Sequence, residues 1–145
     1  MAAGAWVVVN SVGERMGNAE FNFDTDAFVV KLLANTSNIS ATSDDATAVT
    51  GELSTANGYT SGGTSVTPGW TRSSNVSTFD ISDPAFTALG GSIVARWAML
   101  VDTTATPDRV IAYMLLDSTP ADVTTTTGNT LTIVINASGI FTLTS

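Results

Sequence analysis

Closely spaced aspartates are the residues of this chain best suited to chemistry. Residues 24–26 contain two aspartates, and Asp80 and Asp83 lie three positions apart. Either pair could supply oxygen ligands to a hard cation such as Ca²⁺, but loops that bind such ions normally bring more carboxylates and a glycine at a fixed position. We therefore expect these aspartates to be solvated turn residues, and we predict no metal site. Two further aspartates, at residues 44–45, are typical of a helix cap.

The sequence lacks the residues that most often activate a catalytic nucleophile. The chain has no histidine and no cysteine, which removes the commonest general base and every thiolate. A serine or threonine nucleophile would depend on Lys31 or on a carboxylate, and neither a Ser-x-x-Lys nor a Gly-x-Ser-x-Gly motif occurs. Residues 58–63 are glycine-rich, but no P-loop lysine follows them. We expect no enzymatic activity, no catalytic residue and no cofactor.

Basic residues are few and dispersed along the chain. The formal net charge is −8, from 13 acidic and 5 basic residues. A nucleic-acid binder needs clustered lysine and arginine to displace counterions, and an anionic membrane surface attracts the same clusters. The sequence therefore predicts no direct binding to nucleic acid or membrane. The five basic residues are Arg15, Lys31, Arg72, Arg96 and Arg109.

Hydroxyl groups take the place of charges among the polar residues. Only 12% of the residues are charged, whereas 24 are threonine and 15 are serine. An average soluble domain has about 25% charged residues. Because uncharged polar surface is easily desolvated, this composition suits a protein that buries much of its exterior in an assembly. A secreted or extracellular β domain with threonine-rich strands would have the same composition, so both interpretations stay open.

The length and the apolar pattern predict a single cytoplasmically made domain. A chain of 145 residues fits one domain, and we expect a β-sandwich over residues 1–145, with an N-terminal arm at 1–18 as an option. Residues 1–9 lack the basic start of a signal peptide. The apolar stretch 93–101 is interrupted by Arg96 and is too short to span a bilayer. We therefore expect synthesis in the cytoplasm without a targeting segment.

The order of strand-forming and turn-forming residues predicts an all-β fold with about eight strands. Turn residues recur about every 8–12 positions, and threonine, valine, isoleucine and aromatic residues dominate between them. At most one short helix is expected, near residues 44–53, and residues 13–18 are expected to be a loop or a short turn. Residues 27–34 are a strand candidate whose length also allows a helix. Other expected strands are 75–81, 92–102, 109–117, 129–136 and 139–144, while Pro68 places 64–73 at an edge or bend.

Both faces of one predicted hairpin are apolar. Residues 92–102 and 109–117 are joined by a short link and should pair as antiparallel strands. A sheet with one solvated face would show polar outer positions, so the second face must be covered by another sheet or another chain. We favour an antiparallel two-sheet β-sandwich of jelly-roll-like topology. Arg96 is the unusual charged residue here, and pairing with Asp117 or Asp102, snorkelling and a subunit-interface role all remain open.

Apolar and aromatic residues outside the central hairpin are the candidate contact residues. Residues 6–9 form a short apolar run near the start of the chain, and Tyr59 and Trp70 lie in or near turn-rich segments. The two aromatic rings are either core or interface residues, or they provide a stacking surface for a sugar. The candidate interface set is Trp6, Val7, Val8, Val9, Tyr59, Trp70 and Arg96.

A succession of short motifs resembles small structural proteins of tailed bacteriophages, of the minor structural, head-decoration or cement type. The motifs are Trp6, FVVKLL at 28–33, NGYTSGG at 57–63, FDISDPAF at 79–86, ARWAMLVD at 95–102, VIAYMLLD at 110–117 and GIFTL at 139–143. Residues 35–50 fit the pattern least. The resemblance implies no catalytic residues. It implies a location on the exterior of the phage head, the major capsid protein as partner, and a homotrimer as the form of the protein.

The resemblance and the composition together predict a capsid decoration protein that stabilises the shell by bridging major capsid subunits. The alternative is a tail or fibre module that binds a host surface glycan, although the extended or repetitive stem typical of a fibre is not evident in the sequence. A bacterial adhesin domain is a third reading, which would normally begin with a signal peptide. Binding to decoration-free capsids, as opposed to glycans, would separate the first two.

Overall fold

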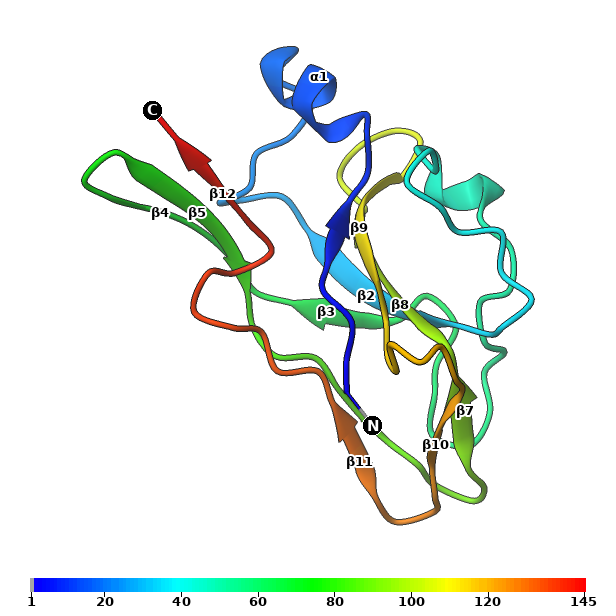
Figure 1. The fold of residues 1–145 in the computed structure, drawn as a ribbon. Coiled ribbons are helices and arrows are strands. Elements are labelled where there is room, and N and C mark those ends of the chain that lie inside the picture. The colour runs from blue at the N-terminus through cyan, green and yellow to red at the C-terminus, as the bar shows by residue number, and fades with distance from the viewer. Residues whose placement is uncertain (1) are drawn as a thin grey trace.

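The computed structural model describes residues 2–145, and the chain is almost entirely β (Figure 1). Short antiparallel strands form several sheets in an arrangement compatible with a sandwich-like fold, which confirms the predicted class. The strands are β1 (Val7–Val8), β2 (Phe28–Leu33), β3 (Thr64–Val66), β4 (Pro68–Ser73), β5 (Val76–Ile81), β6 (Ala85–Thr87), β7 (Ile93–Ala95), β8 (Trp97–Asp102), β9 (Arg109–Leu115), β10 (Val123–Thr125), β11 (Thr130–Thr132) and β12 (Phe141–Thr144).

The largest sheet contains five strands in the order β1-β9-β8-β2-β3. Its central hairpin, β8 and β9, pairs in antiparallel fashion with Met99 opposite Tyr113, as the pattern at 92–117 predicted. A bulge interrupts the register between Leu100 and Val101. Only the first residue of β8 is partly exposed, and the other five are buried. Both faces of this hairpin are therefore covered, as its doubly apolar sequence requires.

Three smaller sheets surround the main one. A three-stranded sheet has the order β12-β5-β4, and two-stranded ribbons pair β11 with β6 and β10 with β7. In Figure 1 the three-stranded sheet lies at the upper left and both ribbons lie at the bottom. Pro68 is the first residue of β4, the edge strand of its sheet, so its missing N–H interrupts no ladder.

Residues 2–145 form twelve short strands where about eight were expected. Two of them, β6 and β10, lie where no strand was expected, and one long apolar run is divided between two sheets. The expected strand 92–102 breaks at Arg96: β7 pairs with β10, whereas β8 pairs with β2 and β9. The Arg96 N–H donates to the Leu33 carbonyl at 2.8 Å, and its carbonyl accepts from the Leu116 N–H at 2.9 Å. Arg96 thus lies at a crossing between two sheets with its backbone groups satisfied.

Two short helical segments complete the fold. Residues 12–17 form α1 (Val12–Gly17), which corrects the expected loop at 13–18. A 3₁₀ turn, η1 (Ala46–Ala48), lies where the one helix was expected, and the Asp45 side chain caps it by accepting the Thr47 N–H at 2.8 Å. Within residues 2–145, no helix combines the length and apolar character needed to cross a membrane.

An aromatic cluster forms the core between the main sheet and the three-stranded sheet. The Phe23 ring lies at its centre, 4.5 Å from Phe79, 5.4 Å from Phe141 and 6.2 Å from Phe28, measured between ring centroids. Phe28 belongs to the main sheet, whereas Phe79 and Phe141 belong to the other one. Burial of these rings is the principal apolar contribution that joins the two sheets.

Ion pairs hold α1 against the main sheet. The Arg15 guanidinium binds both Asp44 and Glu20, and Arg109 of β9 donates to the Asp44 carboxylate at 3.0 Å. The hydrogen bonds from Arg15 hold the pKa of Asp44 below its usual range. Two glycines make the α1 sequence a poor helix former on its own, so these tertiary contacts explain why a helix forms there. Within the optional N-terminal arm at 1–18, residues 7–8 form β1, which pairs with β9, and residues 12–17 form α1.

Candidate interaction surface

A groove runs between the N-terminal segment and the last third of the chain. Its cavity has a volume of about 530 Å³, and it lies between residues 3–6, the end of β9 and residues 131–142. Trp6, Met114, Leu116, Leu131 and Ile140 supply apolar parts of the lining. None of the sixteen described residues that line the groove is charged. A partner that enters this groove would therefore exchange water for apolar surface without desolvating a charge.

One strongly exposed apolar side chain lies in the groove: Val134 lines it and is 73% exposed. Val7 of β1 is 40% exposed and Leu143 of β12 is 44% exposed. They follow the lining residues Trp6 and Thr142 in the chain, but neither is itself part of the lining. Leu89 and Val94 are also exposed but lie elsewhere, beside the two ribbons. Exposed apolar residues around an apolar depression indicate a site of protein contact more often than an isolated exposed leucine does.

The predicted contact residues 6–9 differ in their access to this surface. Trp6 lines the groove and packs against the core with one part of its side chain. Val7 is exposed, Val8 is half-buried, and Val9 is buried at 2% exposure. A partner could therefore contact Trp6, Val7 and Val8 directly, whereas Val9 belongs to the core.

Tyr59 lies at the edge of the main sheet and not at the groove. It is buried at 2% exposure. Its hydroxyl accepts the Leu32 N–H at 3.2 Å and donates to the Glu52 carboxylate at 3.0 Å, while Lys31 lies 3.5 Å from the same carboxylate. Burial raises the pKa of the Tyr59 hydroxyl. This ring supports the edge of β2, and a partner could not reach it in this conformation.

Trp70 of β4 belongs to the aromatic cluster. Its ring stacks on Phe23 at a centroid distance of 5.7 Å and lies 6.0 Å from Phe141. The ring is half-buried, and its free part borders a second cavity of about 370 Å³ that Asn22 and Asp24 also line. Trp70 therefore lies on a different surface from Trp6, although both were candidates for one interface.

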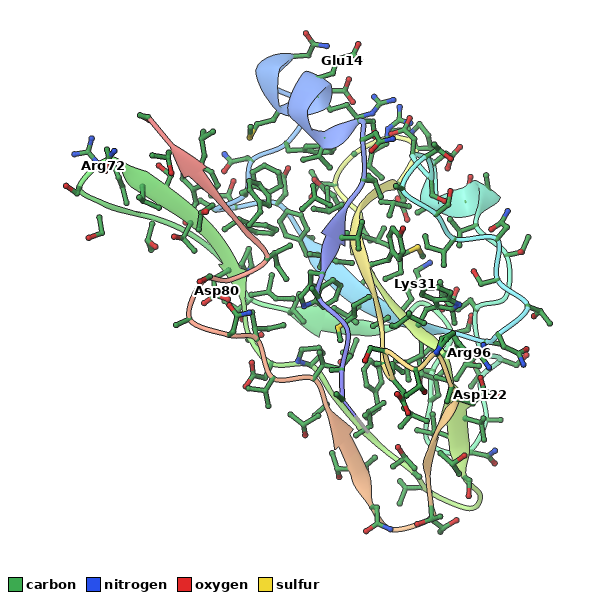
Figure 2. The ribbon with its side chains drawn as sticks, in the orientation of Figure 1. Glu14, Lys31, Arg72, Asp80, Arg96 and Asp122 are labelled. Atoms are coloured by element: carbon green, nitrogen blue, oxygen red, sulfur yellow. The ribbon has the colours of Figure 1, made fainter. Side chains whose placement is uncertain are left out.

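Arg96 pairs with a carboxylate that was not expected. Its Nε donates to Oδ1 of Asp122 at 2.8 Å, and Figure 2 shows the two side chains together at the junction of the main sheet and a ribbon. The predicted partners, Asp102 and Asp117, bind backbone N–H groups of their own loops instead. The expected pairing does not form because the chain turns at Arg96, which directs the side chain away from the hairpin toward the loop before β10.

A buried carboxyl group closes strand β8. Asp102 is fully buried, and its Oδ1 accepts N–H groups from Thr104 at 2.8 Å and Ala105 at 3.3 Å. Within residues 2–145 its Oδ2 has no hydrogen-bond partner. Burial raises the pKa of Asp102 to about 6, and the neighbouring Asp26 carboxyl adds to the rise. Asp102 is therefore an internal, buried group and not a docking feature.

Asp80 and Asp83 accept hydrogen bonds from backbone N–H groups. Asp80 accepts the Ile81 N–H, and Asp83 accepts the Ile135 N–H, both at 2.8 Å. Within the described part of the chain, no three His, Cys, Asp or Glu side chains come together as they would to hold a metal ion. These aspartates therefore act in turns and loop contacts.

Sequence reasoning missed most of the groove. Met114 and Leu116 follow the predicted hairpin pattern, and nothing in that pattern distinguishes them from core residues. Leu131, Val134 and Ile140 lie in two expected strands, 129–136 and 139–144, which the structure pairs with β6 and β5 and not with each other. Comparison of the chain with protein-family models, with curated proteins and with solved structures gives no match. The geometry of the surface is therefore the basis for a functional proposal.

Proposed function

We propose that this chain is a virion structural protein of the decoration or cement type. It binds the outer surface of a phage capsid and bridges major capsid subunits. The single observation that supports this proposal best is the uncharged apolar groove, with the strongly exposed Val134 in its lining. The resemblance of the sequence motifs to phage structural proteins supplies the identity of the partner.

The groove suits a protein segment better than a reactive substrate. Its lining has no carboxylate, lysine or arginine, and its polar groups are threonine and serine hydroxyls, one asparagine amide and backbone. Catalysis would need a group that can transfer a proton or attack a substrate. The core of a protein–protein interface, by contrast, is depleted of charge and enriched in aromatic and apolar side chains.

The proposed mechanism is thermodynamic. A protein that binds the assembled capsid lattice and not the free subunits stabilises the lattice by mass action. Each copy contributes little, but many copies act on one shell. The net charge of −8 opposes close packing of copies, so contacts between copies in the proposed homotrimer would have to be local and to lie outside the groove proposed to bind the capsid.

The test is binding to capsids that lack their decoration protein. Purified chain is mixed with expanded, decoration-free capsids, and co-sedimentation and the temperature of DNA release are measured. We expect saturable binding and a higher release temperature. If the chain neither sediments with the capsids nor changes DNA release, the proposal is wrong.

A second candidate function is glycan binding by a tail or fibre module. One observation favours it: Trp70 borders a cavity together with Asn22 and Asp24, and an indole ring beside an amide and a carboxylate is suited to a sugar. Against it, Phe23 already stacks on the Trp70 ring. Binding on a glycan array that is lost in Trp70→Ala, together with failure to bind capsids, would favour this function.

A further inference from the structure

We infer that the groove accepts an extended segment of a partner protein, which adds to β1 as a new edge strand of the main sheet. This inference rests on the proposed function in that it takes the groove to be a protein-docking site. It adds the form of the occupant: a β-strand, uncharged along its length and apolar at alternate positions, that belongs to a protein other than a second copy of this chain.

One edge of β1 has no neighbouring strand among the described residues. β1 is the outermost strand of the five-stranded sheet. The Val9 N–H donates to the Ile111 carbonyl at 3.1 Å, and Val7 lies opposite Tyr113, so Val7 and Val9 direct their backbone groups toward β9. By the alternation of an antiparallel ladder, Trp6 and Val8 direct theirs away from it. Within residues 2–145, the N–H and carbonyl of Trp6 have no hydrogen-bond partner.

This edge lacks the protection that other edges carry. Natural sheets guard an exposed edge with proline, with charged side chains or by keeping the strand short. β4, an edge of the three-stranded sheet, begins with Pro68 and carries Arg72. Residues 2–9 contain neither proline nor a charged residue. Although β1 itself is short, the chain stays beside β9 as far as Gly4, whose N–H donates to the Leu115 carbonyl at 2.9 Å after a shift in the ladder between Gly4 and Val7. An unprotected, apolar edge is a site for strand addition.

The groove provides the side-chain pockets for such a strand. Trp6, Met114, Leu116 and Ile140 line it next to the open edge. Successive side chains of a strand point to opposite faces, so every second residue of the added strand would enter the groove. Because no lining residue is charged, a charged side chain at those positions would lose its hydration without gaining a partner.

Charge argues for a different protein as the source of the strand. Each copy of this chain has a net charge of −8, so two copies repel one another at long range. The lining has no basic residue to offset that repulsion. A partner of neutral or positive net charge approaches without that penalty, and the chain's own field then assists the encounter.

The probe is a capped six-residue peptide of alternating threonine and valine, titrated into ¹⁵N-labelled protein. Amide shifts report binding, and amide hydrogen exchange reports new hydrogen bonds. We expect shifts at Trp6, Val8 and the groove residues, and at least tenfold slower exchange of the Trp6 and Val8 amides with the peptide bound. If no peptide concentration up to the solubility limit shifts or slows the Trp6 amide, the inference is overturned. This measurement needs no variant and does not depend on how a variant folds.

Val8→Pro is the decisive variant, because proline removes the outward N–H of residue 8. The hydrogen bonds of Val7 and Val9 to β9 stay in place. We expect at least a tenfold loss of peptide affinity. Arg72→Pro is the matched control: by the same alternation its N–H points outward from an edge strand, and Figure 2 shows it at the far end of the β4–β5 hairpin. The control should bind the peptide like the original chain. Equal binding by all three proteins would overturn the inference.

Sedimentation velocity and capsid binding separate the remaining outcomes. Concentration-dependent self-association that Val8→Pro abolishes would identify a second copy as the occupant and overturn the choice of a different protein. Undiminished capsid binding by Val8→Pro would overturn strand addition and leave the proposed function standing. Peptide binding at the groove without any binding to capsids would support strand addition and reject the proposed function.

Discussion

The β8–β9 hairpin and the groove beside β1 use similar apolar residues for opposite purposes. In the hairpin, side chains such as Leu100 and Ile111 are fully buried, and both strands have neighbours on each side. Beside the groove, Val7 and Val134 remain exposed and β1 has a free edge. Apolar character alone therefore does not separate residues that stabilise the fold from those available to a partner. Strand position within the sheet makes that distinction.

The largest expected change in stability comes from a substitution in the β8–β9 hairpin. Leu100→Ala should lower the free energy of unfolding by about 2–5 kcal/mol, because a fully buried leucine leaves a cavity between packed layers. Urea unfolding followed by tryptophan fluorescence measures the change. A loss below about 1 kcal/mol, which is typical of a site that can relax or is partly exposed, would contradict the assignment of β8 to the core.

The buried acid at the end of the hairpin gives the next effect. The folded-state pKa of Asp102 is about 6, above the value of about 3.9 for an unfolded aspartate. The folded protein therefore binds more protons than the unfolded chain between these values. Its stability should fall by about 1–3 kcal/mol as the pH rises from about 4 to about 6. Asp102→Asn should abolish this trend in urea unfolding at several pH values, and an unchanged trend in the variant would assign it to other groups.

A substitution in the ion-pair cluster beside α1 should have a smaller effect on stability. Asp44→Asn should cost about 1–2 kcal/mol of stability at neutral pH, because Asp44 binds both Arg15 and Arg109 at a partly exposed site. Since the pKa of Asp44 is lowered in the folded state, this contribution is present at neutral pH and is lost as the pH falls below about 4. Amide hydrogen exchange in α1 should accelerate in the variant. Unchanged exchange would show that burial of Val12 alone fixes the helix.

The smallest expected effect on stability belongs to the groove. Val134→Asp should change the free energy of unfolding by less than about 0.5 kcal/mol, because the side chain is 73% exposed. Thermal unfolding of the variant and the original chain measures this difference. A large destabilisation would mean that Val134 belongs to the fold and not to a docking surface.

The sequence predicted what depends on local pattern and missed what depends on distant contacts. The antiparallel hairpin at 92–117, the edge position of Pro68 and the capping role of Asp45 follow from neighbouring residues, and the structure agrees. The helix α1 was missed because its sequence favours a loop and ion pairs to Asp44, far along the chain, stabilise it. The break at Arg96 was missed because an alternating apolar pattern continues through it, although the chain changes sheets there.

The candidate surface was foreseen only in part. Residues 6–9 were chosen from their apolar run, and of these Trp6 lines the groove, whereas Val9 is buried in the core. Tyr59, Trp70 and Arg96 were chosen for their residue types, and the fold places them at other sites. The groove itself joins segments near residues 4, 115 and 135, and no pattern within any one of these segments indicates that they meet.

Capsid co-sedimentation of two matched variants tests the central claim most directly. Val134→Asp places a charge in the groove, and Leu89→Asp places the same charge at a residue that is 62% exposed and away from the groove. The proposed docking surface predicts at least a tenfold loss of capsid affinity for Val134→Asp, and affinity close to that of the original chain for Leu89→Asp. Equal affinities for the two variants, or a loss confined to Leu89→Asp, would contradict the assignment of the groove as the docking surface.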